Sequence, residues 1–531
     1  MKKISVLVIM LSMVISAGCG ANPKQENSSA VGIAASSAPS ATESTYNGNA
    51  AATSMPNAEA PDYYVPNQEE YLTVNENSFV DTINNSMLTF SLKVDTASYR
   101  NAIRYINSGN IPPTDAVRTE EFINYFNYDG KMPETDGPFS IYTEVGKSIF
   151  DSSRYLAFIR VKSKDIDRDS LPHSNLTFLI DSSGSMSSYD KLPLLKSAFS
   201  LLTETLTEND TVSIVTYAGN SSIVLDSISG DRKTEINRAI NSLQAGGSTA
   251  GGEGILTAYA LAEKNFKPSG NNRIILATDG DFNVGVSSTK ELERLISRKR
   301  ESGVYLSVLG FGMGNLKDNI METLAKNGNG NYSYIDSISE AKKVLVDELD
   351  SNLYTIADDV KAQVEFNPAL VSSYRLIGYE NRQMDNRDFN NDQKDAGEIG
   401  VGTDVVLMFE LTLANESGGY KYQNDNRQPD NGEYGDELFE VRIRYKDPGA
   451  SSSQLITIPV KTEQVFGENS SDFYFASAVA GFAHLLRNSE HTGGVTINRV
   501  IAQAENNMGY DESNYRMEFI QIAERYKSIT H

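Results

Sequence analysis

The chain has 531 residues and a formal net charge of −23, from 70 acidic and 47 basic residues. This length allows two or three domains. The excess of acid argues against nucleic acid and other polyanions as partners, because like charges repel. Cys19 is the single cysteine, so no intramolecular disulfide can form.

The first 18 residues have the pattern of a signal peptide. Lys2 and Lys3 precede an apolar run over residues 4–15, which is too short for a membrane span. The following Ser-Ala-Gly-Cys resembles a bacterial lipobox, although Ser16 stands where that motif usually has leucine. The resemblance implies that Cys19 becomes lipid-modified and anchors the protein to the cell membrane or outer membrane, outside the cytoplasm. The alternative is an ordinary cleaved signal with an incidental cysteine.

Residues 19–62 are rich in Ala, Ser, Asn, Thr and Pro and nearly lack large apolar side chains. Such a segment cannot bury enough apolar surface to fold, so we expect a disordered linker. At about 5–6 Å times the square root of its length, it would span roughly 35 Å.

An N-terminal module is expected over residues 63–173. Two helices are predicted at residues 94–107 and 115–126, the first ended by Gly109 and the second introduced by Pro112-Pro113. Apolar and polar residues alternate over 139–146 and 155–163, which predicts two half-buried strands.

Strands and helices alternate along residues 174–356. This βα repetition predicts one α/β domain of Rossmann-like type, with a mostly parallel sheet and helices on both faces. The predicted strands are 176–180, 211–217, 223–226, 273–279, 304–311 and 331–335. The predicted helices are 191–207, 233–242, 254–266, 290–302, 316–326 and one starting at 339.

Residues 357–531 return to the alternation of an antiparallel sheet, followed by helices. The predicted strands are 360–366, 371–379, 403–413, 437–445 and 455–460, with a polar loop at 415–436. Closing helices are predicted at 473–487, 498–507 and 514–527. We expect these strands and those of residues 139–163 to form one β-sandwich, into which the α/β domain is inserted.

The strand at 176–180 ends in a cluster of oxygen-bearing side chains. Asp181 follows it directly, and Ser183 and Ser185 occupy the next alternate positions. The carboxyl end of a buried strand is where α/β folds place ligands. Three hard oxygen donors on one tight loop favour a small hard cation such as Mg²⁺ over zinc or copper. The alternative is a chance Asp-Ser-Ser-Gly-Ser turn that caps a helix.

Asp-x-Ser-x-Ser resembles the metal-ion-dependent adhesion site (MIDAS) of von Willebrand factor type A domains. That family adds a threonine and a second aspartate on two further loops, which Thr249 and Asp279 match in order. The resemblance implies that Asp181, Ser183, Ser185, Thr249 and Asp279 hold Mg²⁺, with Mn²⁺ or Ca²⁺ as alternatives. It also implies that a carboxylate from a protein or peptide ligand takes the remaining position.

The flanking modules resemble those of one bacterial lipoprotein subfamily of type A proteins. Val-Asp-Thr-Ala-Ser-Tyr from Val94 and Ala-Val-Arg-Thr-Glu-Glu-Phe from Ala116 carry the N-terminal resemblance. Tyr-Arg-Leu-Ile-Gly-Tyr-Glu from Tyr374 and Asp-Ala-Gly-Glu-Ile-Gly from Asp395 carry the C-terminal one. The resemblance implies architecture and assigns no activity.

A second metal loop is considered at residues 388–398. Asp388, Asn390 and Asp392 have the opening spacing of a calcium loop, but Gln393 and Ile399 occupy positions that need glycine and glutamate. A solvated turn is the favoured interpretation.

We therefore expect a membrane-anchored binding protein of adhesion type rather than an enzyme, with no catalytic residues. The sequence has four histidines, no Gly-x-Ser-x-Gly elbow and no phosphate-binding loop with its lysine. Two alternatives stay open. The first is a structural envelope protein without metal-dependent binding, and the second, which is less favoured, is a metal-dependent hydrolase.

Overall fold

The structure is a computed structural model that describes residues 68–93, 95–248, 251–280, 289–414 and 434–530. The described residues belong to one compact unit, Val65–His531. The expectations for the signal peptide, Cys19 and the linker lie outside the described residues. Among the residues that are described, no helix has the length and apolar character needed to cross a membrane.

A six-stranded sheet forms the centre of the α/β region, in the order β10-β9-β8-β5-β6-β7. All neighbours are parallel except β6 and β7, which form an antiparallel pair at one edge. The strands are β5 (Ser174–Asp181), β6 (Thr211–Tyr217), β7 (Ser221–Ser229), β8 (Asn271–Thr278), β9 (Tyr305–Phe311) and β10 (Tyr332–Ile335).

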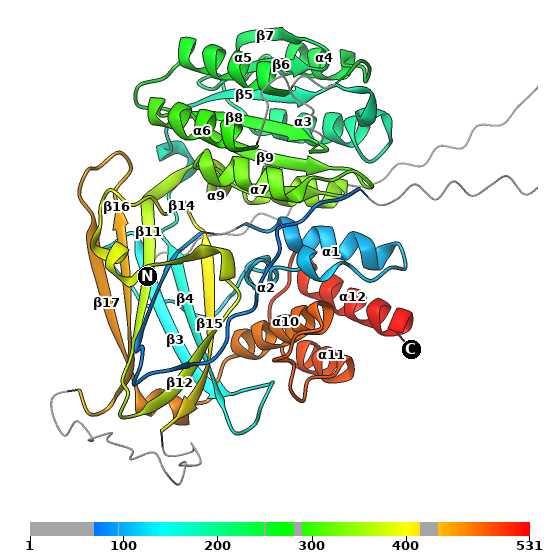
Figure 1. The fold of residues 1–531 in the computed structure, drawn as a ribbon. Helices are drawn as coiled ribbons and strands as arrows, with labels where there is room; N and C mark the ends of the chain where they lie inside the picture. The colour runs from blue at the N-terminus through cyan, green and yellow to red at the C-terminus, as the bar shows by residue number, and fades with distance from the viewer. Residues whose placement is uncertain (1–67, 94, 249–250, 281–288, 415–433, 531) are drawn as a thin grey trace, which may run out of the picture. The chain divides into compact units, whose positions relative to one another are not determined.

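Helices cover both faces of this sheet (Figure 1). Leu176, Phe178 and Ile180 of β5 point into one core, whereas Leu179 points into the other. Burial on both faces explains why β5 is a continuous apolar run rather than an alternating one. The helices are α3 (Leu192–Thr205), α4 (Lys233–Ser242), α5 (Gly251–Lys264), α6 (Thr289–Lys299), α7 (Asp318–Asn327), α8 (Ile338–Lys342) and α9 (Leu349–Leu353).

The edge strand β7 departs from the predicted βα repetition. It is longer than the expected 223–226 and returns antiparallel to β6. The two strands form a hairpin, closed by a hydrogen bond from Ala218 N to Asn220 O of 3.1 Å. Because this edge strand is only partly covered, Ile223 stays 53 % exposed.

Two further sheets form an antiparallel sandwich, in the orders β1-β12-β15-β4-β3 and β13-β2-β11-β16-β17. Strand β4, before the α/β region, pairs with β15, after it, from Tyr155–Leu411 to Lys162–Asp404. The predicted fold class is therefore confirmed: an α/β domain is inserted into a β-sandwich. The strands are β1 (Val80–Asp81), β2 (Met87–Ser91), β3 (Phe139–Lys147), β4 (Tyr155–Ser163), β11 (Thr355–Phe366), β12 (Val371–Ile377), β13 (Gln383–Met384), β14 (Gly397–Gly400, paired with β11), β15 (Asp404–Leu413), β16 (Glu437–Lys446) and β17 (Gln454–Lys461).

The prediction that β4 is half-buried is wrong. Ala157 and Ile159 point into the sandwich, and Leu156 and Phe158 pack into a second core on the opposite face. Helices cover that face, so side chains on both faces of the strand are buried. The helices that contribute to this second core are α1 (Ala97–Asn107), α2 (Thr119–Ile123), α10 (Ser471–Arg487), α11 (Ile497–Asn506) and α12 (Tyr515–Thr530).

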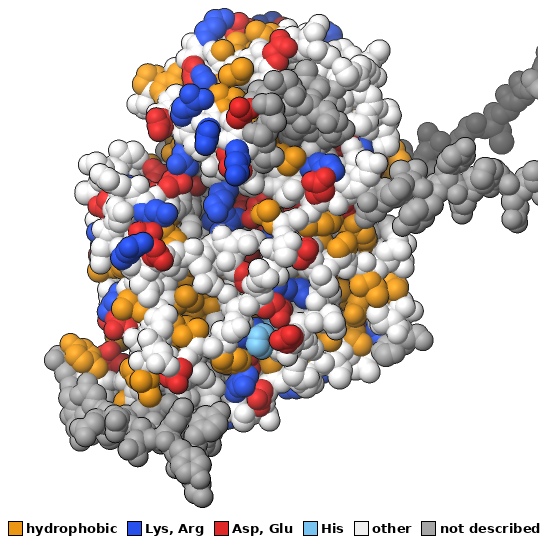
Figure 2. All heavy atoms as spheres, viewed as in Figure 1, with side chains coloured by type: hydrophobic (Ala, Val, Ile, Leu, Met, Phe, Trp, Pro, Cys, Tyr) orange, Lys and Arg blue, Asp and Glu red, His pale blue; other side chains and the backbone are white. Residues whose placement is uncertain are grey.

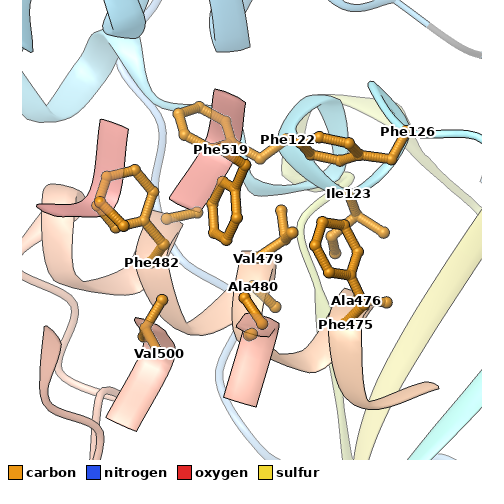
Figure 3. Close-up of a cluster of buried hydrophobic side chains, with 14 of the residues drawn as sticks. Phe122, Ile123, Phe126, Phe475, Ala476, Val479, Ala480, Phe482, Val500 and Phe519 are labelled. Atoms are coloured by element: carbon orange, nitrogen blue, oxygen red, sulfur yellow. The ribbon is translucent and has the colours of Figure 1, made fainter. Parts of the chain in front are cut away.

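Aromatic side chains dominate the core between these helices. Figure 3 shows Phe122, Phe126, Phe475 and Phe519 gathered together, with Phe482 from the same helix as Phe475. Phe126 meets Phe475 edge-on at 5.1 Å between ring centroids, a geometry that adds attraction beyond area burial. The C-terminal helices thus complete a core begun by the N-terminal module.

Two N-terminal elements differ from their predictions. The helix expected at residues 115–126 is reduced to α2, because Val117 and Arg118 are extended after a single 3₁₀ turn. Strand β2 was not predicted, yet it pairs with β11 beside the sandwich core. Its five residues begin with the adjacent apolar pair Met87 and Leu88, so they do not alternate strictly.

Buried ion pairs join the α/β domain to the surrounding elements. Arg118, only 1 % exposed, binds Asp318 at the start of α7, with 2.7 Å between Nη1 and Oδ2. Arg100 of α1 reaches Asp336 at 2.9 Å and Glu518 of α12 at 2.8 Å. These contacts cross the boundaries between segments that are far apart in the sequence.

Candidate metal centre

The residues of the predicted metal loop meet where β5 and β8 end. Asp181 is the last residue of β5, and Asp279 directly follows β8. Because the two strands are parallel neighbours, their carboxyl ends lie at the same edge of the sheet. Thr278 Oγ1 donates to Asp181 Oδ2 at 3.0 Å and so joins the two strand ends.

The loop after β5 folds back on its own aspartate. Ser183 N donates to Asp181 Oδ1 at 2.9 Å, and the hydroxyl oxygens of Ser183 and Ser185 lie 3.0 Å apart. Ser183 stands at the start of a 3₁₀ turn, but its side chain makes no capping hydrogen bond. The Ser183 side chain therefore does not act as the helix cap that the alternative interpretation proposed.

The loop that carries Thr249 reaches this site through its backbone. Gly246 N donates to Ser182 O at 2.8 Å, and Gly184 N donates to Gly247 O at 3.1 Å. Thr249 itself lies outside the described residues, so its assigned role stays a prediction. The other four predicted residues are brought to one place.

The two carboxylates are both fully buried but differ in their electrostatic environment. Burial and the neighbouring Asp279 raise the pKa of Asp181 to about 6, although hydrogen bonds from Ser183 and Thr278 oppose the rise. Burial alone would also raise the pKa of Asp279, but the Lys191 ammonium and hydrogen bonds from Ser185 and Asn315 bring it below its usual value. Charge on Asp181 is thus the less compensated of the two.

Sequence reasoning missed two residues that hold Asp279. Lys191 Nζ lies 2.9 Å from Asp279 Oδ2 and 2.8 Å from Asn315 Oδ1. Asn315 Nδ2 donates to the same Asp279 oxygen at 3.1 Å. Lysine is almost always solvent-exposed, so nothing in the sequence marked Lys191 as buried.

The oxygen set fits a small hard cation. In an octahedron with metal–oxygen distances of about 2.1 Å, adjacent ligands are separated by about 3.0 Å. The two serine hydroxyls have this separation, and Asp181 and Asp279, at the ends of β5 and β8, add two carboxylates. Among the described residues no group of three His, Cys, Asp or Glu side chains could hold a metal, so this candidate depends on hydroxyl donors.

In the alternative calcium loop at residues 388–398, the side chains of Asp392, Asp395 and Asn390 bind other protein groups. Asp392 accepts from Ser453 Oγ at 2.5 Å, and Asp395 pairs with Arg300 at 2.8 Å. Asn390 accepts from Arg444 at 3.3 Å. These partners agree with the favoured interpretation of this segment as a turn.

Family comparisons divide the chain into three matched segments. Residues 175–347 match the von Willebrand factor type A domain, and residues 65–157 match a model described as von Willebrand factor. Residues 351–529 match the model described as uncharacterized protein YfbK, C-terminal. A type A domain implies a protein-interaction or adhesion-type function, and proteins of this kind are typically not enzymes.

Similar proteins extend the match over nearly the whole chain. Uncharacterized protein YfbK of Escherichia coli (strain K12) is 44 % identical over 475 residues, which cover 88 % of this chain and 82 % of that protein. Uncharacterized protein sll0103 of Synechocystis is 25 % identical over 57 % of this chain and 68 % of its own length. A solved von Willebrand factor type A structure from Catenulispora acidiphila, 14 % identical, covers 74 % of this chain and 91 % of its own with a TM-score of 0.41. The chain therefore belongs to the family of von Willebrand factor type A proteins that includes YfbK, with a type A domain followed by the YfbK C-terminal module.

Proposed function

We propose that this protein is a membrane-anchored, extracytoplasmic binding protein whose type A domain uses Mg²⁺ to engage a carboxylate of a protein or peptide partner. Asp181, Ser183, Ser185, Thr249 and Asp279 would hold the cation, with Mn²⁺ or Ca²⁺ as substitutes. Bound there, the cation supplies a positive centre that attracts an anionic oxygen.

The observation that carries the proposal is the unequal charge balance at the ends of β5 and β8. Two buried carboxylates share one ammonium group, that of Lys191, which hydrogen-bonds to Asp279. Asp181 accepts only neutral donors in the described structure: Ser183 N, Tyr217 Oη and Thr278 Oγ1. A buried carboxylate without a cation is costly, and a divalent ion would remove that cost.

The surroundings of the site suit a protein or peptide partner. Tyr189 is 80 % exposed on the loop before Lys191, and Met313 is 43 % exposed on the loop before Asn315. Lys191 packs against Gly312, so these two loops are neighbours. Tyrosine and methionine are enriched in protein interfaces, where they could pack beside the partner's carboxylate.

On the face shown in Figure 2, the described residues form no large patch of side chains of one charge that could select the partner. There, Lys and Arg side chains are interspersed with Asp and Glu. On this face, local contacts at the metal centre would then decide specificity.

The anchor is proposed from the sequence alone. Ser16-Ala17-Gly18-Cys19 follows an apolar stretch and resembles a lipobox. Lipid on Cys19 would hold the folded part outside the cell membrane or on the outer membrane.

A structural envelope protein without metal-dependent binding is the second candidate. Lys191 favours it, because its ammonium already neutralises Asp279. In that case the site would be complete without a divalent ion.

Calorimetric titration of the full chain in detergent with MgCl₂ separates the two candidates. Binding to the wild type and its loss in Ser183→Ala/Ser185→Ala support the proposal. Ser197→Ala, an exposed serine on α3, is the matched control and should bind as the wild type does. A pull-down of envelope proteins should then lose its partner in EDTA. Absence of Mg²⁺ binding together with indifference to EDTA would leave the structural candidate.

A further inference from the structure

The first described residues of the chain, 68–71, form a strap beside the loop between β9 and α7. Gln68 N donates to Gly314 O at 3.0 Å, and Glu70 N donates to Leu316 O at 2.9 Å. Glu70 and Lys317 form a parallel bridge, and Lys317 Nζ binds Glu70 Oε1 at 2.6 Å. The strap thus adds a short strand-like edge to residues 314–317.

Glu69 fixes the strap to the N-terminal module. Its Oε1 accepts from Gly314 N at 2.7 Å, while its Oε2 accepts from Tyr71 at 2.6 Å and from Tyr105 at 2.5 Å. Arg104 of α1 also binds Oε2, and the Glu69 side chain is 1 % exposed. One buried carboxylate therefore links helix α1 to the loop at Gly314.

The other side of this loop contacts the metal centre. Asn315 Nδ2 donates to Asp279 Oδ2 at 3.1 Å. Gly280 has φ +87° and lies close to Lys317. A Cβ on Gly280 would be 2.7 Å from the backbone nitrogen of Lys317. Residues 314–317 are thus placed between the strap and the segment that carries Asp279.

We propose that the strap is a positioning element of the metal centre and that Glu69 is its positioning residue. Glu69 fixes Gly314, Gly314 precedes Asn315, and Asn315 orients Asp279. The proposal rests on the proposed function, because it assigns the strap a part in cation binding. Without the strap, Gly314 and Leu316 lose three hydrogen bonds to residues 68–70. Asn315 then keeps its side-chain contacts with Lys191 and Asp279 but loses the support of the backbone beside it.

The test is a magnesium titration of the full chain carrying Glu69→Gln, which keeps the size of the side chain and removes its charge. Changing a group that orients a metal ligand typically weakens metal affinity by about 10–100-fold. We expect a loss toward the lower end of that range, because Glu69 acts on Asp279 only through Gly314 and Asn315. Asn315→Ala should weaken Mg²⁺ binding as well, and the double variant should lose less than the product of the two single losses, because both act along one route.

Glu144→Gln is the matched control. Glu144 is also buried and accepts from Ser470 N at 2.7 Å, but it lies in the sandwich on β3. We expect it to lower the melting temperature without changing the dissociation constant for Mg²⁺. If Glu69→Gln and Glu144→Gln leave the affinity equally unchanged while the wild type binds, the strap proposal is overturned and the proposed function stands.

Hydrogen exchange in EDTA gives a readout that needs no metal. Glu69→Gln should speed exchange of the amides of Gly314 and Asn319, which donate to Glu69 Oε1 and Glu70 O, whereas Glu144→Gln should not. Unchanged exchange there overturns the proposal, and a wild type that binds no Mg²⁺ overturns it together with the proposed function. Should Glu69→Gln fail to fold, Gln68→Pro removes one backbone donor at an exposed position and should shift both readouts less, in the same direction.

Discussion

Buried carboxylates occur in two regions of this molecule and are treated differently in each. Where the type A domain meets the N-terminal module, arginines face them: Arg118 binds Glu121 and Asp318, and Arg100 binds Asp336. At the ends of β5 and β8, two carboxylates have one lysine and several neutral donors between them.

The difference distinguishes a structural network from the proposed binding site. Arginine offers five donors in a fixed plane and keeps its charge, so one guanidinium can bind two carboxylates at once. Lysine and hydroxyl groups around Asp181 and Asp279 leave negative charge that a mobile cation can neutralise. The following changes test this contrast, from the largest expected effect to the smallest.

Replacing Arg118 by alanine should have the largest effect on stability. It leaves Glu121 and Asp318 buried without their main partner, and breaking a buried pair in this way costs about 3–5 kcal/mol. Urea unfolding of the full chain measures the change. Arg387→Ala is the control: its pair with Asp385 is exposed, so a loss of about 0–1 kcal/mol is expected. Similar losses from the two variants would contradict the contrast.

A second change tests whether the network is fully compensated. Burial raises the pKa of Glu340 to about 7, with Asp336 adding to the rise, while Arg100, Lys343 and a hydrogen bond from Tyr125 oppose it. An acid with a raised pKa in the folded state stabilises below its unfolded pKa of about 4.5, and this stabilisation is lost as pH rises toward 7.

Glu340→Gln should therefore gain stability relative to the wild type over that pH window, on the order of 3 kcal/mol from the difference in pKa. Unfolding by urea at pH 4.5 and at pH 7 measures the gain. A constant difference between the two proteins at both pH values would show that Arg100 and Lys343 compensate Glu340 completely.

Asp181→Ala should remove the effect of magnesium on stability. A cation that binds only the folded state stabilises it by about 2.7 kcal/mol at a hundredfold excess over Kd. Melting of the wild type in MgCl₂ and in EDTA should differ accordingly, and melting of Asp181→Ala should not. In EDTA the variant should melt at or above the wild type, because repulsion with Asp279 is gone. Asp226→Ala, an exposed change on β7, should keep the magnesium increment.

Lys191→Met should have the smallest effect of these changes. Unlike Asp181→Ala, it should strengthen Mg²⁺ binding. Removing the ammonium beside Asp279 leaves more negative charge, so Mg²⁺ affinity should rise about tenfold, or about 1.4 kcal/mol. Stability in EDTA should fall, since Asp279 loses its cation. A lower affinity for Mg²⁺ would show that Lys191 helps to assemble the site rather than to compete with the cation.

The sequence alone determined the elements whose periodicity is strong and local. The βα repetition of the type A domain, the sandwich strands on either side and the insertion of one into the other follow from patterns within single segments. The grouping of the predicted metal residues was also readable, because Asp181, Ser183 and Ser185 are close in sequence and Asp279 directly follows a strand parallel to β5. The roles of these residues and of Thr249 stay predictions.

Only the tertiary structure decided what distant segments do to one another. Strand β4 reads as half-buried, but α10 and its neighbours, from the C-terminal part of the chain, cover its outer face. Lys191 and Asn315 have no sequence signal, since their importance arises from reaching Asp279 across separate loops. The same holds for Glu69, which meets Gly314 at a separation of 245 residues. The local sequence pattern indicates which face of a helix or strand is buried. Packing between elements that are far apart in the chain decides which polar groups come into contact.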